Sequence, residues 1–274
     1  MRRSRYEISD DRLGKGAFGM VLSAVDSKTR QKVACKKQAT SNRYEYRVLM
    51  SLRNSKASSV VPEPLSYSEE SDGSSLLFMD KMDVDLAQLS RDVDMQNDAR
   101  LLLSVAINLM TSLSKLHDAG WLHRDVKPGN IMMRNGSGRV YLVDFGMAKK
   151  FRSKDTGEHI SFVSKKKTVV GTAKYLSLWG HQHMQQSRRD DMASAMYTLA
   201  QVANGRLPWA RGGKQKPHME DIQRMKRKTL PEELFDGLPP SFAEVQKRVM
   251  ALKFYERPAY TRYINIFLRD LKRL

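Results

Sequence analysis

Hydrophobic residues in the first third of the chain follow the pattern of short β-strands. Residues 20–26 are apolar and rich in strand-forming side chains, residues 27–30 carry a turn signal, and residues 31–36 and 76–79 indicate further strands. Between them, residues 42–50 have the pattern of a helix. This part of the chain therefore predicts a mainly antiparallel sheet with one helix.

Helical periodicity dominates the rest of the chain. Apolar side chains recur at helical spacing through residues 98–117, and Gly120 can end that helix. Residues 241–244 read Ser-Phe-Ala-Glu, which has the form of a capping box and predicts a helix to about residue 252.

Two strand-like segments interrupt this helical region. Residues 131–133 and 140–143 flank an Asn-Gly-Ser-Gly turn signal and predict a hairpin. We therefore expect an α+β fold with a sheet-containing N-lobe over residues 1–79, a connection at 80–83, and a mainly α-helical C-lobe over 84–274.

The strongest motif in the chain surrounds this hairpin. The string His-Arg-Asp-Val-Lys-Pro-Gly-Asn ends at Asn130, and Asp-Phe-Gly begins 14 residues later at Asp144. The Asp125 carboxylate can accept a hydroxyl proton, and the Lys127 ammonium can neutralise charge on a moving phosphoryl group. Asn130 and Asp144 offer the hard oxygen ligands that Mg²⁺ prefers. The two strings together predict a phosphoryl-transfer site.

This pair of motifs resembles the eukaryotic-type protein kinases. The resemblance implies that residues 1–274 form one bilobal protein kinase domain with a hinge at residues 80–83. It also implies ATP and Mg²⁺ as cofactors, Asn130 and Asp144 as metal ligands, and Asp125, Lys127 and Lys36 as catalytic residues.

The glycine-rich segment at residues 14–21 agrees with this resemblance, because it fits G-x-G-x-x-G-x-V. Strand patterns flank it, whereas a dinucleotide-binding turn would lead into a helix. Glycines here would let the backbone approach phosphates, and Phe18 at the tip could shield those phosphates from water. An ordinary tight hairpin is the alternative interpretation.

The string Val-Ala-Cys-Lys that ends at Lys36 matches the kinase strand with the phosphate-binding lysine. Side chains alternate along a strand, so Ala34 and Lys36 share one face and Cys35 lies on the other as a buried filler. Ala34 could cover the adenine while Lys36 reaches the phosphates. Glu45 is the only acid between Lys36 and Glu63, which makes it the candidate partner of Lys36; a solvated helix acid is the alternative.

The resemblance also places the rest of the nucleotide pocket. Met79 would stand as the gatekeeper at its back. The residues implied to contact ATP are Gly14, Lys15, Gly16, Ala17, Phe18, Gly19, Met20, Val21, Ala34, Lys36, Glu45, Met79, Asp80 and Met82.

The segment after Asp144 narrows the family. It contains no Ala-Pro-Glu, and it has Gly-Thr-Ala-Lys-Tyr-Leu-Ser from Gly171 and Ser-Arg-Arg-Asp-Asp-Met from Ser187. These strings resemble the casein kinase 1 family over about residues 6–272, with the vaccinia-related kinases as near neighbours. The resemblance implies a serine/threonine kinase, since Lys127 is typical of that acceptor class.

The same resemblance gives structural roles to two further residues. Asp191 should start the central helix of the C-lobe and hold the backbone of the catalytic loop, and Thr172 should bridge Asp125 and Lys127. The chain departs from the family pattern at Lys174, where arginine is usual, and at Gly129, where aspartate is usual. A further departure is Ser-Leu-Trp at residues 177–179 in place of Ser-Ile-Asn. None of these changes removes a catalytic group.

The net charge of the chain indicates which class of substrate it attracts. The 48 lysines and arginines against 30 acids give a net charge of +18, which attracts polyanions. The basic residues concentrate at 165–167, 188–189, 206–216 and 226–228.

We expect protein substrates with acidic or phosphorylated segments, which casein kinase 1 enzymes favour. Lys174 would be one anion ligand, and Lys214 and Lys216 would be others. The alternative is a basic surface for solubility or nonspecific nucleic-acid contact, although basic residues do not alternate with aromatic ones as base stacking would require.

Two other function classes stay open: a non-catalytic kinase fold that acts as a scaffold, and a protein whose main role is nucleic-acid binding. The single cysteine is typical of a reducing compartment. No stretch approaches the about 18 apolar residues of a membrane span, and no secretory core follows the first residues. We therefore expect an intracellular protein of the cytoplasm or nucleus without a membrane span. The oligomeric state stays open.

Overall fold

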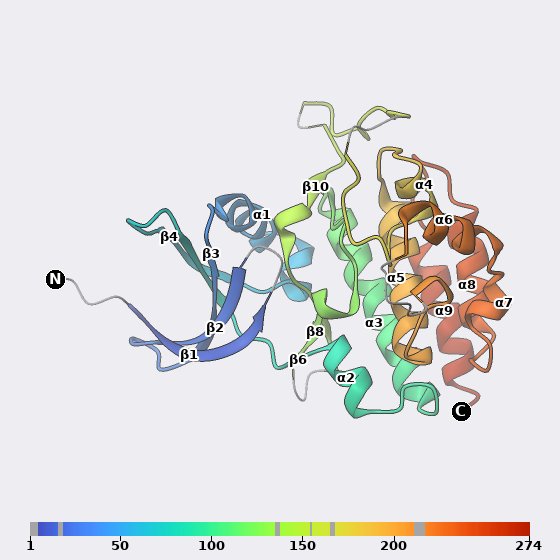
Figure 1. The fold of residues 1–274 in the computed structure, drawn as a ribbon, viewed down its shortest axis with the longest axis horizontal. Helices are drawn as coiled ribbons and strands as arrows, with labels where there is room; N and C mark the ends of the chain where they lie inside the picture. The colour runs from blue at the N-terminus through green and yellow to red at the C-terminus, as the bar shows by residue number, and fades with distance from the viewer. Residues whose placement is uncertain (1–4, 16–18, 135–137, 154, 165–167, 211–216) are drawn as a thin grey trace.

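The structure, a computed structural model, describes residues 5–15, 19–134, 138–153, 155–164, 168–210 and 217–274. Figure 1 shows two lobes, with the larger sheet at the N-terminal end and the longer helices packed together in the C-terminal part. The expected α+β architecture is confirmed.

The N-lobe is built on a five-stranded antiparallel sheet in the order β1-β2-β3-β5-β4. The strands are β1 (Tyr6–Lys15), β2 (Gly19–Asp26), β3 (Lys32–Gln38), β4 (Pro64–Glu69) and β5 (Ser75–Asp80). The helix α1 (Arg43–Arg53) and the 3₁₀ turn η1 (Lys56–Val60) lie between β3 and β4. In the register, Gly14 lies opposite Val21 and Lys15 opposite Met20. The glycine-rich segment therefore connects two antiparallel strands, as predicted.

Short elements fill the region between the lobes. A three-stranded sheet runs in the order β6-β8-β9, and a separate pair joins β7 to β10. These strands are β6 (Val84–Asp85), β7 (Trp121–Leu122), β8 (Ile131–Met133), β9 (Val140–Leu142) and β10 (Lys149–Lys150), with 3₁₀ turns η2 (Pro128–Asn130) and η3 (Phe145–Met147). They form the frame that carries both candidate catalytic strings.

The C-lobe is helical. Its helices are α2 (Leu86–Asp92), α3 (Ala99–Asp118), α4 (Leu178–His181), α5 (Arg188–Asn204), α6 (Met219–Lys228), α7 (Pro231–Leu234), α8 (Ser241–Met250) and α9 (Tyr260–Leu271), with a 3₁₀ turn η4 (Pro208–Ala210). The Asp98 carboxylate caps α3 by accepting from the Leu101 N–H at 2.9 Å. Gly120 follows its end at φ +82°, a conformation that glycine adopts without strain.

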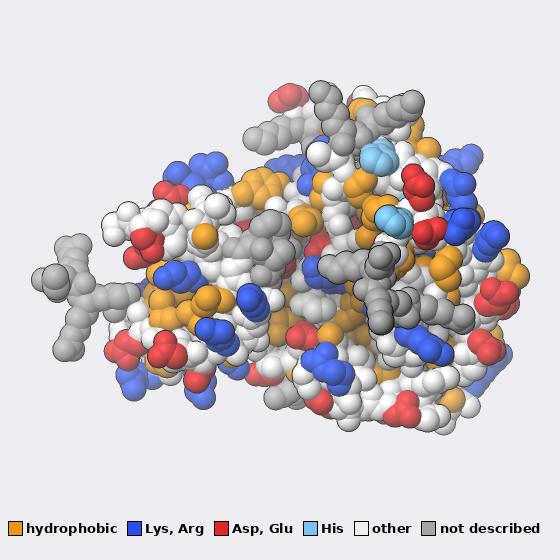
Figure 2. Space-filling model, in the orientation of Figure 1, with side chains coloured by type: hydrophobic (Ala, Val, Ile, Leu, Met, Phe, Trp, Pro, Cys, Tyr) orange, Lys and Arg blue, Asp and Glu red, His pale blue; other side chains and the backbone are white. Residues whose placement is uncertain are grey.

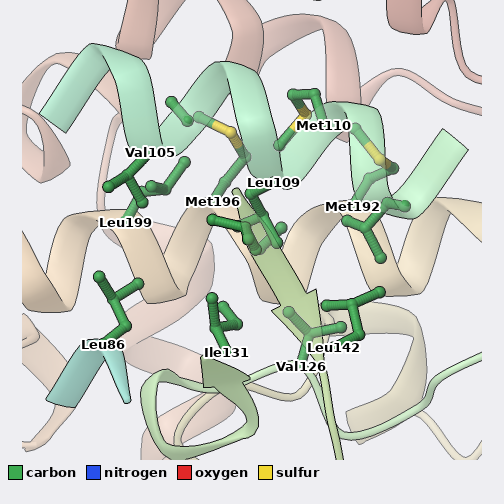
Figure 3. Close-up of a cluster of buried hydrophobic side chains, with 14 of the residues drawn as sticks. Leu86, Val105, Leu109, Met110, Val126, Ile131, Leu142, Met192, Met196 and Leu199 are labelled. Carbon is green, nitrogen blue, oxygen red and sulfur yellow. The ribbon is translucent and has the colours of Figure 1, made fainter. Parts of the chain in front are cut away.

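A continuous core ties the helices to the strands between the lobes. Figure 3 shows Leu109 of α3 and Met196 of α5 in one cluster with Val126, Ile131 and Leu142. All five side chains are almost completely buried. The buried methionines of this cluster therefore act as core filling, and the same packing fixes the strands on either side of the catalytic strings.

α3 is the one helix among the described residues that is long and apolar enough to cross a membrane by length and composition. The expectation that no stretch approaches a membrane span is therefore wrong by length and composition. Half of its apolar window is buried inside the structure, so packing within the C-lobe accounts for its composition.

The predicted capping box at residues 241–244 is wrong. Pro240 is the N-cap of α8, and Ser241 is already helical. The Ser241 N–H donates to the Asp270 carboxylate of α9 at 2.8 Å, and Glu244 accepts from Arg248 at 3.0 Å. A carboxylate distant in sequence therefore caps this helix, and the local string does not reveal it.

Truncating the centre of this core should destabilise the protein. We expect Leu109→Ala to lower the free energy of unfolding by about 2–5 kcal/mol, because it leaves a cavity in a rigid cluster. Urea unfolding followed by circular dichroism measures the change. The control is Arg100→Ala on the exposed part of the same helix, which should stay within about 0.5 kcal/mol of wild type. Equal effects of the two substitutions would contradict this packing.

Candidate active site

One buried carboxylate sets the conformation of the segment around Asp125. Asp191, in the first turn of α5, accepts from the backbone N–H of His123 at 2.7 Å and of Arg124 at 2.8 Å. Arg124 has a φ of +68°, an unfavourable conformation for a non-glycine residue, and these bonds hold it there. The predicted role of Asp191 is confirmed.

A histidine and a tyrosine lie behind Asp191, and the sequence analysis did not find them. His117 Nε2 lies 2.9 Å from the Asp191 carboxylate, and His117 Nδ1 is hydrogen-bonded to the Tyr260 hydroxyl. Burial raises the pKa of Asp191, but the interactions with His117 and His123 together outweigh burial, and the pKa lies below its usual range. Tyr260 is 143 residues from His117, so no local pattern could signal the contact.

Asp125 lies at the centre of a compact polar cluster. Its carboxylate accepts from the Lys127 ammonium at 2.6 Å and from the Thr172 hydroxyl at 2.7 Å. The Thr172 N–H also donates to it at 3.0 Å, and Lys127 Nζ lies 3.4 Å from the Thr172 hydroxyl. The expected bridge by Thr172 is present. A carboxylate held this way has a fixed orientation, as a general base requires.

On the N-lobe side, Lys36 of β3 joins the two lobes. Its ammonium lies 2.6 Å from Glu45 of α1 and 2.8 Å from Asp144. The structure therefore forms the expected contact with Glu45, which is buried rather than solvated. The other Glu45 oxygen accepts from the Phe145 N–H at 3.1 Å, so the position of α1 and that of the Asp-Phe-Gly turn are linked.

Lys36 and Asp144 stabilise each other's charge, whereas burial keeps the pKa of Glu45 above its usual range. Burial lowers the pKa of Lys36, but the carboxylates of Glu45 and Asp144 outweigh burial and raise it. Burial likewise raises the pKa of Asp144, yet the Lys36 ammonium, together with His123 and Lys127, outweighs burial and leaves that pKa below its usual range. Near neutral pH, the site therefore presents a charged lysine and an ionised aspartate.

The walls of the expected nucleotide pocket come from β2, β3 and β5. Ala34 lies opposite Met79 in the β3–β5 register, and both side chains are buried. Val21 packs against the same core, and Met82 is buried in the connection between the lobes. Cys35 points into a separate cluster, as predicted, and burial raises the pKa of its thiol to about 12.

The structure gives three different results for other residues that were expected to contact ATP. The Asp80 carboxylate accepts from the Arg134 guanidinium at 3.1 Å, a partner that the sequence analysis did not find. Gly19 has no room for a side chain, since an added Cβ would lie 2.1 Å from the Lys37 carbonyl oxygen. The expectations for Gly16, Ala17 and Phe18 lie outside the described residues.

The donor set fits a divalent metal that is shared with phosphates. Within the described ranges, no three His, Cys, Asp or Glu side chains form a group able to hold a metal ion. The Asn130 side-chain N–H₂ donates to the Asp125 backbone carbonyl at 2.9 Å, which leaves the amide oxygen of Asn130 as its ligand atom. That oxygen and Asp144 could hold Mg²⁺, which typically takes one or two protein ligands and completes its shell with phosphate and water.

Three residues of the expected basic clusters are buried, so they belong neither to an open anion site nor to a basic surface. Arg188 donates to the Tyr255 carbonyl at 2.7 Å, and the Arg189 guanidinium lies 4.1 Å from the centre of the Trp179 ring. Lys226 is 4% exposed. Carbonyl oxygens and aromatic faces replace water around these side chains, so they do not form an open basic surface.

Of the three lysines expected to bind the substrate anion, only Lys174 lies within the described residues. Lys174 is half-buried, with its ammonium 5.6 Å from the centre of the Tyr175 ring, and burial lowers its pKa. Lys214, Lys216 and the cluster at 165–167 lie outside the described residues.

Residues 7–266 match the family described as Protein kinase domain. The match covers nearly the whole chain and both lobes, so the chain belongs to the protein kinase family. The site thus belongs to a domain that binds ATP and phosphorylates proteins, a reaction that uses a divalent metal.

The close approach of Gly171 to the catalytic loop gives a test of this geometry. Gly171 has a φ of +110°, and an added Cβ would lie 2.6 Å from the Arg124 carbonyl oxygen. We expect Gly171→Ala to lower the free energy of unfolding by about 1–3 kcal/mol, because it adds both strain and a clash. Urea unfolding measures the effect.

The matched control is Gly129→Ala in the same region. An added Cβ at Gly129 meets no atom within 4 Å. This substitution should therefore leave the free energy of unfolding unchanged or raise it slightly. A stable Gly171→Ala protein would show that the catalytic loop and the segment around Gly171 are not in contact.

Proposed function

We propose that this protein is an active serine/threonine kinase related to casein kinase 1, which transfers the γ-phosphate of ATP to hydroxyl groups of protein substrates. The observation that carries the proposal is the cluster of Asp125, Lys127 and Thr172, whose side chains lie within hydrogen-bonding distance of one another. Such a cluster can orient an acceptor hydroxyl beside a phosphoryl group.

Each charged group has a defined role in this proposal. Asp125 orients the acceptor hydroxyl and takes its proton, and Lys127 stabilises negative charge on the transferred group. Lys36, fixed by Glu45, binds the α- and β-phosphates. Asp144 and Asn130 hold Mg²⁺, which supplies charge neutralisation at the phosphates when it is bound.

Retention of these groups favours catalysis over a scaffold role. A non-catalytic kinase fold would be expected to lack the phosphate-binding lysine, the catalytic aspartate or a metal ligand. Here Lys36, Asp125, Asn130 and Asp144 are all present. Lys36 of the N-lobe donates to Asp144 at 2.8 Å, and the Asn130 side chain donates to the Asp125 carboxylate at 3.1 Å.

The placement in the casein kinase 1 family rests on sequence strings. These are Gly-Thr-Ala-Lys-Tyr-Leu-Ser from Gly171 and Ser-Arg-Arg-Asp-Asp from Ser187. Lys127 supports serine or threonine as the acceptor, as in the family pattern. The Asp190 carboxylate adds a structural argument: it accepts from the Ser187 N–H at 2.7 Å and binds the Ser177 hydroxyl. The two strings therefore meet in space as one unit.

The proposed substrates carry acidic or phosphorylated residues near the acceptor, and Lys174 is the proposed main ligand for that negative charge. It lies two residues after Thr172, which contacts Asp125. Burial lowers the pKa of Lys174, so a nearby anion would recover the free energy of charging it. Lys214 and Lys216 are further proposed ligands.

Nonspecific nucleic-acid contact is the second candidate, because of the net charge of +18. Figure 2 shows lysine and arginine side chains on both lobes, interspersed with acidic side chains on that face. Burial of Arg188, Arg189 and Lys226 reduces the basic surface further. These observations favour protein substrates as the main partners.

Removing the proposed base should abolish most of the turnover. We expect Asp125→Asn to lower kcat about 10²- to 10⁴-fold while the Kd for ATP stays within about twofold, because the change affects the acceptor side. The measurement is transfer of radiolabelled phosphate from ATP to casein, with ATP affinity from calorimetry. Asp118→Asn on the exposed end of α3 is the control. Wild-type turnover by Asp125→Asn would exclude this assignment.

The substrate proposal is tested with a peptide panel. Peptides carry phosphoserine, aspartate or alanine a few residues before the acceptor serine. We expect kcat/KM to fall in that order, because a phosphate carries about −1.5 to −2 charges. The preference should shrink in Lys174→Ala and at high salt, where exposed charges are screened.

Lys253→Ala serves as the matched control, since Lys253 is exposed on the same lobe. It should keep the wild-type preference. The same kcat/KM for all three peptides, or an unchanged preference in Lys174→Ala, would show that Lys174 does not bind the substrate anion.

A further inference from the structure

Lys226 in α6 is a buried lysine within a strongly basic chain. It is 4% exposed, although Arg224, Arg227 and Lys228 in the same helix are exposed. Its side-chain nitrogen donates to the backbone carbonyls of Ala173 at 2.9 Å and Leu176 at 2.6 Å. Figure 1 shows α6 beside α4, and α4 directly follows the segment that contains Ala173 and Leu176.

Neutral groups surround the Lys226 amine. Its nitrogen lies 3.1 Å from His181 Nε2 and within 4.8 and 5.2 Å of the ring centres of Tyr197 and Trp209. In the part of the chain that the structure describes, no carboxylate forms an ion pair with it. An isolated buried charge is costly, and burial lowers the pKa of Lys226 to about 6.

His181 is buried beside it. Burial and the adjacent lysine lower the pKa of His181 to about 4, so the imidazole is neutral at physiological pH. Both an ammonium and a neutral amine have at least two N–H groups. Lys226 can therefore donate to both carbonyls in either protonation state, and the contact with the segment does not depend on its charge.

Trp209 makes a third contact with the same segment. Its indole N–H donates to the Lys174 carbonyl at 2.8 Å, and its ring packs against Lys226 and Tyr197. The carbonyls of residues 173, 174 and 176 are thus all bound by two side chains from the region after α5. Residues 172–177, which we name the acceptor segment, have their backbone fixed by the C-lobe.

The acceptor segment carries the groups that the proposed reaction uses on the protein-substrate side. Thr172 contacts Asp125, and Lys174 is the proposed anion ligand. The ATP side is served by other elements, β3, α1 and the turn at Asp144. A change at Lys226 should therefore affect the protein substrate more than it affects ATP.

We propose that Lys226, together with Trp209, is a positioning residue for the protein substrate: it holds the carbonyls of Ala173 and Leu176 so that Thr172 and Lys174 face the acceptor. This inference rests on the proposed kinase function for its kinetic consequence. Its structural part, the attachment of the acceptor segment, does not.

The kinetic test compares Lys226→Met with Lys228→Met. Methionine keeps most of the apolar side-chain volume and removes the nitrogen that donates to both carbonyls. Lys228 is an exposed lysine in the same helix, so its substitution is the matched control. We expect Lys226→Met to raise the KM for a phosphoserine-containing peptide about tenfold, since two buried carbonyls lose their donor. The KM for ATP should stay within about twofold, and Lys228→Met should match wild type. Equal rises in both KM values, or an unchanged peptide KM, would overturn the proposal.

Hydrogen exchange provides a second measurement that does not need activity. The amides of Tyr175 and Leu176 both donate to the Thr172 carbonyl, at 2.9 and 3.0 Å. We expect them to exchange about tenfold faster in Lys226→Met, because this turn loses its attachment. Unchanged exchange would overturn the proposal.

Further measurements separate this proposal from two other outcomes, a variant that does not fold and a protein that is not a serine/threonine kinase. If Lys226→Met does not fold, Trp209→Phe removes the indole donor and keeps an aromatic ring, and it should raise the peptide KM with the KM for ATP unchanged. If wild type phosphorylates no serine or threonine peptide, the proposed function fails, and hydrogen exchange still decides whether Lys226 fixes the acceptor segment.

Discussion

The attachment of the catalytic loop to Asp191 is the interaction on which the rest of the site depends. The Asp191 carboxylate is buried in the C-lobe, and it can remain ionised because two backbone N–H groups and His117 surround it. It holds Arg124 in a strained conformation, and that backbone turn aims Asp125 toward the space between the lobes. Tyr260 supports His117 from α9. A carboxylate within the helical core thus determines where the reactive carboxylate lies.

Most of the site could be predicted from the sequence because its parts are short strings with fixed chemistry. Spacing placed Asp125 and Asp144 on adjacent loops, and strand alternation placed Lys36 on the face opposite Cys35. Glu45 was identified because other acids were absent nearby in the sequence, and Thr172 through the family resemblance. In each case the residue type, the spacing and the local element agreed, and the expected contact is present in the structure.

The errors concern residues whose partners are far away in sequence. The string at residues 241–244 has the right composition for a capping box, but Asp270 takes over the capping. Arg188 and Arg189 were counted among the basic clusters that could bind anions, since net charge does not show that a helix N-terminus lies inside the lobe. Lys226 was misjudged for the same reason, because its acceptors are two backbone carbonyls about 50 residues earlier in the chain. Tertiary packing, rather than local pattern, decided all of these positions.

The central claim is that these groups form a metal-dependent serine/threonine kinase site. The most direct measurement is transfer of radiolabelled phosphate from ATP to casein with Mg²⁺, after chelation with EDTA, and after Mg²⁺ is restored, followed by phosphoamino-acid analysis. We predict label on serine or threonine that disappears with EDTA and returns with Mg²⁺. Transfer that is unaffected by EDTA, label on tyrosine alone, or no transfer under any of these conditions would contradict the claim.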